Sequence, residues 1–202
     1  DIAEKFFLWS LEFNIKTVTF YALSKDNIEK RPSEEVSAVI SNMYEKLSKL
    51  ESSGIIEKYN VRIKTLGNKE LLPEKLRTKL EELEIKTKSN SGVFLNIAVA
   101  YSGRYEIIDA VRRIAKEVKE GKIDPQEINE EVFMSKLYTG DILYPEPDII
   151  IRTSGEMRLS DFLLYQSSYS EMIFIDIYWP DLRKIDFLRI LRTYEKRNRR
   201  FG

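Results

Sequence analysis

Hydrophobic residues along the chain follow two alternating patterns. Short runs rich in β-branched and aromatic residues predict strands, and longer stretches with apolar residues three or four positions apart predict helices. Between them lie polar segments that carry Gly, Pro, Asn or Ser, which are typical of turns. The predicted strands cover residues 16–22, 60–66, 93–100, 149–151 and 173–177.

The predicted helices fall between these strands. They cover residues 1–13, 33–50, 73–88, 102–118, a segment within 121–139 that Asp124 and Pro125 would begin, and 161–171. Alternating strands and helices predict an α/β fold with a mainly parallel central sheet flanked by helices, in a single domain over 1–202. The run 93–100 is almost wholly apolar, as in a strand buried on both faces, so Asn96 within it needs a hydrogen-bond partner.

Composition narrows the chemistry. Lys plus Arg equals Asp plus Glu at 33 each, so net charge does not indicate a nucleic-acid partner. Histidine and cysteine are both absent, which excludes disulfides, Ser-His-Asp triads and zinc sites built on His or Cys. A catalytic metal would need oxygen ligands, which favours Mg²⁺. With neither a signal peptide nor an apolar run of about 20 residues, a cytoplasmic protein is expected.

The segment from Asp148 to Asp176 concentrates the candidate chemistry. Arg152 closes a short strand, a Thr-Ser-Gly turn follows, and Arg158 and Ser160 come within the same loop. Ser160 is placed to cap a helix that begins at Asp161. A strand end, a glycine-bearing loop and a helix N-terminus together predict an anion site, to which two arginines add donors suited to phosphate. Alternatively, Arg152 and Arg158 pair with carboxylates such as Asp148 or Glu156, and the local chemistry does not decide between the two.

The order of residues is more specific. The string IIIRTSGEMRLSDFLLYQSSYSEMIFIDIYWPD, with the ending RNRRFG, resembles the cis-prenyltransferases, the undecaprenyl diphosphate synthase family. The resemblance implies that the strand-end loop holds isopentenyl diphosphate. It also implies a homodimer in which the terminal Arg-x-Gly of one chain reaches the active site of the other. The residues assigned to substrate binding on this basis are Arg152, Arg158, Leu159, Ser160, Arg200 and Gly202.

A metal role follows from the same resemblance. Glu171 occupies the place of a family glutamate that binds Mg²⁺ together with an aspartate. That aspartate belongs to an N-terminal MDGNxRW-type segment, and residues 1–202 contain no such segment. We therefore expect either an upstream segment that carries it or a fragment that is inactive alone. Without the resemblance, Glu171 would be read as a surface glutamate.

A second string, YALSKDNIEKRP, resembles the family's YAFSxENWxRP. The resemblance makes Asn27 a catalytic residue that helps to position proton abstraction, and it makes Arg31 a ligand of the allylic diphosphate. Ile28 replaces the family tryptophan, and one extra residue precedes Arg31, so Lys30 is an alternative for that role. Substrate contact is also expected for Ser24, Lys25, Asp26 and Ile28. Sequence pattern alone would instead place Asp26 and Asn27 in the first turn of a helix.

The function that the resemblance implies is transfer of prenyl groups. Isopentenyl diphosphate would be condensed with an allylic prenyl diphosphate to give a Z-polyprenyl diphosphate, with peripheral membrane contact for release of the lipid product. LNIAVAYSGRYEI matches a further family motif, in which Arg104 would anchor a loop. Met43 and Leu47 could line a product tunnel, although their helical spacing is equally typical of core. Two alternatives stay open: a non-catalytic subunit of a cis-prenyltransferase complex, and an unrelated phosphate-binding module.

Overall fold

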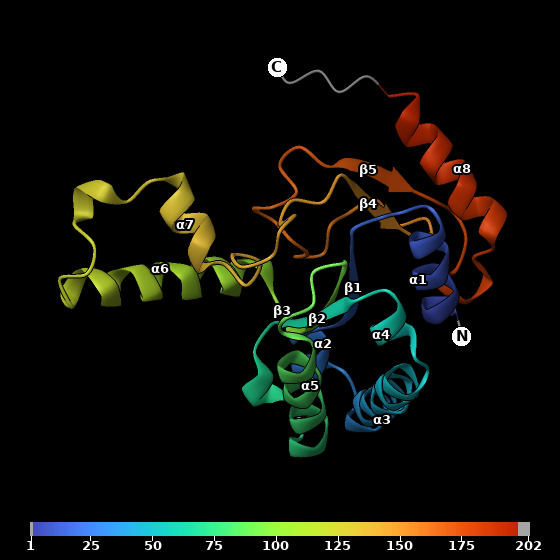
Figure 1. Ribbon diagram of the computed structural model, residues 1–202, viewed down its shortest axis with the longest axis horizontal. Coiled ribbons are helices and arrows are strands. Elements are labelled where there is room, and N and C mark those ends of the chain that lie inside the picture. Colours follow the sequence, from blue (N-terminus) through green and yellow to red (C-terminus); the bar gives the residue numbers. More distant parts are fainter. Residues whose placement is uncertain (1, 198–202) are drawn as a thin grey trace. The chain divides into compact units, whose positions relative to one another are not determined.

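The computed structural model describes residues 2–197 of the 202-residue chain and shows an α/β protein with parallel strands (Figure 1). The chain forms two compact units. One combines Asp1–Ile15 with the segment from Glu146 onward, and the other is Lys16–Pro145. The predicted α/β class and parallel pairing are confirmed. The strands form two sheets, however, with three strands in one and two in the other.

The unit Lys16–Pro145 is built on three parallel strands in the order β1-β3-β2. These strands are β1 (Thr17–Ser24), β2 (Val61–Leu66) and β3 (Val93–Tyr101). All nine residues of β3 are buried, as its apolar sequence predicts for a central strand. Asn96 within it finds a partner, because its Nδ2 donates to Oγ1 of Thr19 on β1 over 3.1 Å.

Helices connect these strands. They are α2 (Lys25–Lys30), α3 (Ser33–Ser52), α4 (Ile55–Lys58), η1 (Lys69–Leu71), α5 (Glu74–Thr87), α6 (Gly103–Lys119), η2 (Pro125–Glu127) and α7 (Glu130–Lys136). The helix expected within 121–139 is replaced by two short elements. Asp124 caps only the 3₁₀ turn η2, and Asn129 begins α7 by accepting a hydrogen bond from the Val132 N–H. The sequence signal at Asp124 and Pro125 was therefore that of a turn.

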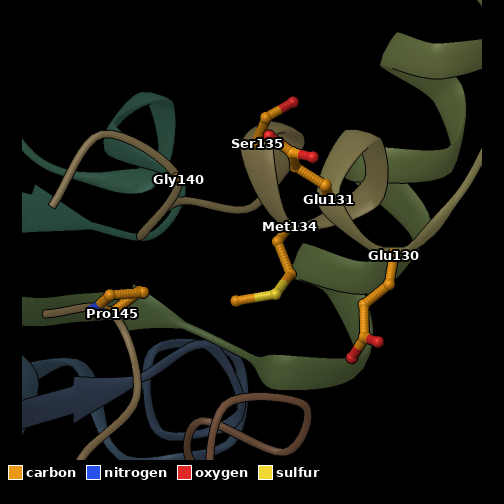
Figure 2. A pocket seen from close by; sticks show the side chains of 6 residues that line it. All are labelled: Glu130, Glu131, Met134, Ser135, Gly140 and Pro145. Carbon is orange, nitrogen blue, oxygen red and sulfur yellow. The ribbon is translucent and has the colours of Figure 1, made fainter. Parts of the chain in front are cut away.

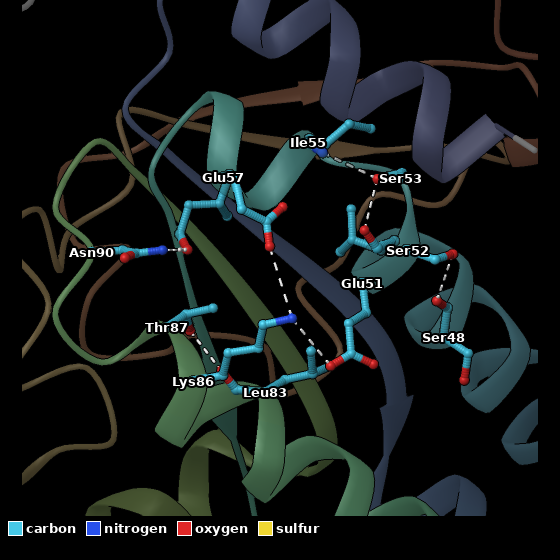
Figure 3. A network of polar contacts seen from close by, with 12 residues as sticks. Ser48, Glu51, Ser52, Ser53, Ile55, Glu57, Leu83, Lys86, Thr87 and Asn90 are labelled. Atoms are coloured by element: carbon cyan, nitrogen blue, oxygen red, sulfur yellow. Dashed lines mark hydrogen bonds and ion pairs between the residues drawn. The ribbon is translucent and has the colours of Figure 1, made fainter.

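Side-chain contacts attach α5 to β2 and to α3. Oγ1 of Thr87 accepts from the Ile63 N–H over 2.9 Å and donates to the Leu83 carbonyl over 2.7 Å. The Glu51 carboxylate of α3 pairs with Lys79 of α5. It also pairs with Lys86, which reaches Glu57 as well (Figure 3). These contacts fix the helix that precedes the central strand.

The second unit contains α1 (Ile2–Glu12), β4 (Ile149–Arg152), β5 (Glu171–Phe174), η3 (Trp179–Asp181) and α8 (Lys184–Glu195). The helical spacing predicted for the first residues is confirmed, because Phe6 is buried and packs on Phe187 of α8 and Trp179 of η3 with ring centroids 5.1 and 5.6 Å apart. Helix α8 accordingly lies beside α1 in Figure 1. Strands β4 and β5 run parallel, with Ile149 opposite Glu171 and Arg152 opposite Phe174.

The helix expected at 161–171 is wrong. Residues 160–169 form a series of turns. Ser160, Asp161 and Leu163 have φ values of 50°, 65° and 42°, in the left-handed region that breaks a right-handed helix. Leu163 is nevertheless buried, so the apolar spacing that suggested a helix reflects burial within a compact loop.

Candidate functional site

Arg152 and Ser160 form the centre of the candidate anion site in the loop after β4. Nη1 of Arg152, the last residue of β4, donates to Oγ of Ser160 over 2.8 Å. Arg152 is half-buried and Ser160 is exposed, so their hydrogen bond lies at the protein surface. The structure thus brings together two of the donors that the sequence assigned to diphosphate binding.

The turn after β4 contributes differently from expectation. Ser154 and Gly155 both have φ of 70°, and their N–H groups donate to the carbonyls of Ile177 and Ile175 over 2.9 and 3.1 Å. These two amides are therefore engaged within the protein. Because residues 160–169 also lack a helix, no helix dipole acts at Ser160. Anion binding here depends on the side chains of the loop.

Arg158 lies in the same loop and is exposed. Its Nη1 is 2.5 Å from Oε2 of Glu156, which is one of the ion pairs considered from sequence. The pair is open to solvent, because 64% of the Arg158 side chain and 44% of the Glu156 side chain are exposed. Such a pair is weak, and another anion can easily replace Glu156 as the partner of Arg158. Leu159 beside it is half-buried. Arg158 is therefore accessible to a ligand.

Glu171 stands at the other end of the two-stranded sheet. It opens β5 opposite Ile149, whereas Arg152 lies opposite Phe174 at the closing end. Three residues of strand separate the two positions by roughly 10 Å at about 3.3 Å per residue. The Glu171 carboxylate forms an ion pair with Arg197, the first residue of the ending RNRRFG, to which the sequence assigned no role of its own. Glu171 is thus not a neighbour of Arg152 and Ser160 along this sheet.

The residues of the second string lie in the other unit. Ser24 ends β1 and caps α2, with its Oγ accepting from the Asn27 N–H over 3.0 Å. Asp26 and Asn27 therefore occupy the first turn of a helix, as the pattern alone indicated. Asn27 and Ile28 are half-buried, and Lys25 pairs with Glu29 at 3.1 Å.

Arg31 and Lys30 differ in their availability. Nζ of Lys30 bonds Oδ2 of Asp26 over 2.6 Å, which lowers the pKa of Asp26 and raises the pKa of Lys30. Within the described residues the exposed Arg31 side chain has no hydrogen bond or ion pair. The contact with Asp26 thus favours Arg31 over Lys30 as the free cation.

The parallel pairing brings the closing residues of the three strands to one edge. Ser24 and Tyr101 are register partners there, and β2 ends beside β3 at Leu66. Gly67 follows, and a Cβ at this position would lie 2.1 Å from the Val99 carbonyl oxygen, so only glycine fits. Ser102 caps α6 at the same edge by accepting from the Tyr105 N–H over 3.1 Å. This edge is where ligands of parallel α/β sheets commonly bind.

Two features of the unit Lys16–Pro145 were not visible in the sequence. Glu106 is buried, and its carboxylate accepts hydrogen bonds from the Tyr101 hydroxyl and the Tyr138 N–H.

The second feature is an open hollow of about 550 Å³ that lies along α7 and the loop after it (Figure 2). Glu130 and Glu131 line this hollow, and none of the predicted site residues does. Its carboxylates would repel a diphosphate, so the hollow does not suit a diphosphate ligand.

Residues 2–197 lack two features. No group of three or more acidic side chains is placed to surround a metal ion in this part of the chain. Among the same residues, no helix combines the length and apolar character needed to cross a bilayer. Arg200 and Gly202, assigned to substrate binding from the sequence, lie outside the described residues.

Comparison with known proteins settles the family. The family model described as putative undecaprenyl diphosphate synthase matches residues 1–202. The chain belongs to this family, the cis-prenyltransferases. A tritrans,polycis-undecaprenyl-diphosphate synthase (geranylgeranyl-diphosphate specific) of Thermococcus kodakarensis is 49% identical over 98% of this chain and 74% of its own length. Its counterpart in Methanopyrus kandleri is 48% identical over 100% of this chain and 73% of its own.

Solved structures agree with these relatives. Lavandulyl diphosphate synthase from Lavandula x intermedia, in complex with dimethylallyl diphosphate, superposes with a TM-score of 0.89 at 33% identity, covering 97% of this chain and 83% of that one. A probable undecaprenyl diphosphate synthase from Campylobacter jejuni gives 0.83 at 34% identity, over 100% and 90%. This cis-prenyltransferase is therefore an enzyme of Z-polyprenyl diphosphate synthesis, and the accessory-subunit alternative is not favoured.

Proposed function

We propose that this cis-prenyltransferase condenses isopentenyl diphosphate with an allylic prenyl diphosphate, with Mg²⁺ bound at Glu171. The observation that carries the proposal is the contact of Arg152 with Ser160 at the closing end of β4, with the accessible Arg158 in the same loop. Two guanidinium groups and a hydroxyl provide forked, charge-assisted donors that suit the oxygens of a diphosphate. They hold isopentenyl diphosphate.

The reaction needs no protein nucleophile. The alkene of isopentenyl diphosphate attacks the allylic carbon, the bond from that carbon to its diphosphate breaks, and a proton leaves the new chain. Arg31, whose side chain has no partner among the described residues, supports the departing diphosphate as its negative charge grows. Asn27, held at the start of α2 by the Ser24 cap, positions the group that accepts the proton.

The residues present fit a magnesium ion. With neither His nor Cys in the chain, the ligands must be oxygens. Magnesium retains several waters and binds through one or two carboxylates, so the partly buried carboxylate of Glu171, 22% exposed, is a suitable ligand. When bound, the ion supplies positive charge that neutralises the diphosphate oxygens. The aspartate that the resemblance implies as a second ligand stays a prediction.

The proposal extends to the primer and the assembly. The relatives from Thermococcus kodakarensis and Methanopyrus kandleri are named as geranylgeranyl-diphosphate specific, which supports geranylgeranyl diphosphate as the allylic primer. A homodimer, in which Arg200 and Gly202 of one chain complete the other's site, remains part of the proposal. So do a single domain over 1–202, a cytoplasmic location and peripheral membrane contact during product release.

The test is incorporation of labelled isopentenyl diphosphate by the full-length protein. Geranyl, farnesyl and geranylgeranyl diphosphates are supplied separately with Mg²⁺, and the products are sized by reversed-phase chromatography. We expect elongation, fastest from geranylgeranyl diphosphate. Arg112→Ala, which removes an exposed arginine of α6, is the control and should match the wild type. Lack of incorporation with every primer would overturn the proposed function, whereas preference for a shorter primer would overturn only the primer assignment.

A further inference from the structure

The Glu171 carboxylate has a single partner among the described residues. That partner is Arg197, whose Nη1 contacts Oε2 of Glu171. The Glu171 side chain is 22% exposed and that of Arg197 is 46% exposed, so the pair lies at the border between sheet and solvent. The carboxylate proposed to bind a metal is thus already neutralised by a cation of the protein itself.

Arg197 follows Lys196, the C-cap of α8. This end of the helix is attached at two points to the opening end of the two-stranded sheet. The Tyr194 hydroxyl lies 3.3 Å from Oδ1 of Asp148, and Arg197 reaches Glu171. The two acidic residues are themselves neighbours, because the Glu171 N–H donates to the Asp148 carbonyl over 2.9 Å. One turn of helix end is therefore attached to two adjacent carboxylates.

A guanidinium and a divalent cation make incompatible demands on this carboxylate. Both bind its oxygen lone pairs, and arginine cannot relieve the repulsion by losing its proton. A metal ion at Glu171 would therefore have to displace Arg197 or bind beside a positive charge. Because the ion pair is partly solvent-exposed, displacing Arg197 from Glu171 costs little free energy.

We propose that Arg197 is a built-in competitor for the divalent cation at Glu171. In the metal-free enzyme it neutralises the carboxylate and holds the end of α8 against the sheet. Metal binding releases Arg197 and so loosens the end of α8 from the sheet. Such coupling is reciprocal, so whatever frees Arg197 tightens metal binding. The proposal rests on the metal role proposed above for Glu171.

The direct test is Mn²⁺ binding to the full-length protein without substrate. Binding is measured as the loss of the free-ion signal in electron paramagnetic resonance. Arg197→Gln should tighten Mn²⁺ binding roughly two- to fivefold, the worth of one partly exposed ion pair. Lys196→Gln is the matched control, because it removes the same charge from the adjacent exposed residue and should leave affinity unchanged. Equal affinities for the two variants, or weaker binding by Arg197→Gln, would overturn the proposal.

Glu171→Gln separates this proposal from the metal assignment beneath it. If Glu171 binds the ion, this variant loses affinity, and adding Arg197→Gln to it produces no further change. If Glu171→Gln binds Mn²⁺ as the wild type does, or if the wild type shows no Glu171-dependent site, both the metal assignment and the competition are wrong. Prenyl transfer is measured in a separate assay with labelled substrate, so failure of the metal assignment can be distinguished from failure of the proposed function.

Hydrogen exchange provides a second readout. The amides of Lys196 and Arg197 donate to the Arg192 and Tyr194 carbonyls over 3.3 and 3.0 Å at the end of α8. Release of Arg197 should let this end open more often, so the two amides should exchange faster when Mn²⁺ is added to the wild type. Glu171→Gln should show no such change. Exchange that is unaltered or slowed by Mn²⁺ in the wild type would contradict release.

Discussion

Arg152 and Ser160 meet across the loop that joins β4 to β5, with Nη1 of the arginine 2.8 Å from the serine Oγ. The seven residues between them include two consecutive left-handed positions, Ser154 and Gly155, that turn the chain back on itself. This one contact gathers donors at the closing end of a parallel strand, where α/β sheets bind ligands. It is the geometric basis for assigning diphosphate binding to this loop.

Substitution of either member of this pair should weaken binding of isopentenyl diphosphate. Arg152→Ala removes a charged donor and should lower kcat/KM for isopentenyl diphosphate roughly 10- to 100-fold, while Ser160→Ala removes one neutral donor and should lower it roughly 2- to 10-fold. Because the two side chains touch, their effects should not be additive in a double-mutant cycle. Steady-state kinetics with Arg112→Ala as control measures both. Additive or negligible effects would contradict a shared site.

Substitutions of Arg158 and of Glu156 should affect the KM for isopentenyl diphosphate differently. Arg158→Ala should raise the KM for isopentenyl diphosphate because a cation is lost from the loop. Glu156→Gln frees the same arginine from its 2.5 Å ion pair and should leave that KM unchanged or lower it. The comparison is made on purified variants at fixed ionic strength, since exposed charges are screened by salt. An increase in KM for both variants would show that the ion pair, not the free arginine, is needed.

Gly155 should tolerate a side chain less well than another glycine of the same backbone conformation. Its φ is +70°, and a Cβ would lie 3.0 Å from Oδ1 of Asp176. Gly121 has φ of +68° with nothing within 4 Å, so Gly121→Ala measures backbone strain alone. We expect each alanine to cost about 1 kcal/mol of strain, with a further loss at Gly155 from the contact with Asp176. Chemical denaturation measures the difference, and equal losses would remove the contact from the explanation.

The ion-pair network of Figure 3 should make stability depend on pH. The hydrogen bond from Lys79 lowers the pKa of Glu51 below its ordinary value of 4.5, with smaller help from Lys86. A lowered pKa means that the stabilisation is complete above the unfolded-state pKa and is lost as pH falls through the folded-state pKa. Glu51→Gln should therefore be less stable than the wild type at pH 7, by on the order of 0.5 kcal/mol for partly exposed pairs. The gap should narrow as pH falls below 4.5 and close once pH has passed through the lowered pKa of Glu51.

Glu45→Gln is the control for that experiment, since Glu45 is an exposed residue of the same helix. Thermal unfolding of the three proteins between pH 3 and pH 7 gives the comparison. A gap between wild type and Glu51→Gln that stays constant over this range would contradict the role of the Glu51 charge.

Much of the fold could be predicted from the sequence because its strands carry strong local signals. The run ending at Leu66 alternates buried apolar with polar residues, and the run ending near Tyr101 is almost wholly apolar. Gly67 and Ser102 follow them, so the ends of both strands fall within two residues of prediction. The turns at 160–169 could not be predicted, because apolar spacing does not distinguish a helix from a buried loop. Which strands share a sheet was equally hidden, since pairing depends on distant segments.

The sequence named residues for the candidate site, whose roles stay predictions, but it did not define the geometry of the site. Motif order placed Arg152 and Ser160 in one site, and the structure confirms that they touch. The same reading placed Glu171 in a metal site without its partner Arg197, because 26 residues separate them and no sequence period links the two. Glu171 and Arg152 lie at opposite ends of the sheet formed by β4 and β5 because of the register of the two strands. The sequence does not determine that register.

The most direct test of the account is a crystal structure of the full-length enzyme soaked with isopentenyl diphosphate and Mg²⁺. The account predicts the diphosphate within hydrogen-bond distance of both the Arg152 guanidinium and the Ser160 hydroxyl, with Arg158 turned from Glu156 toward it. A diphosphate bound elsewhere, while this loop remains empty and the pair of Arg158 with Glu156 stays intact, would contradict it.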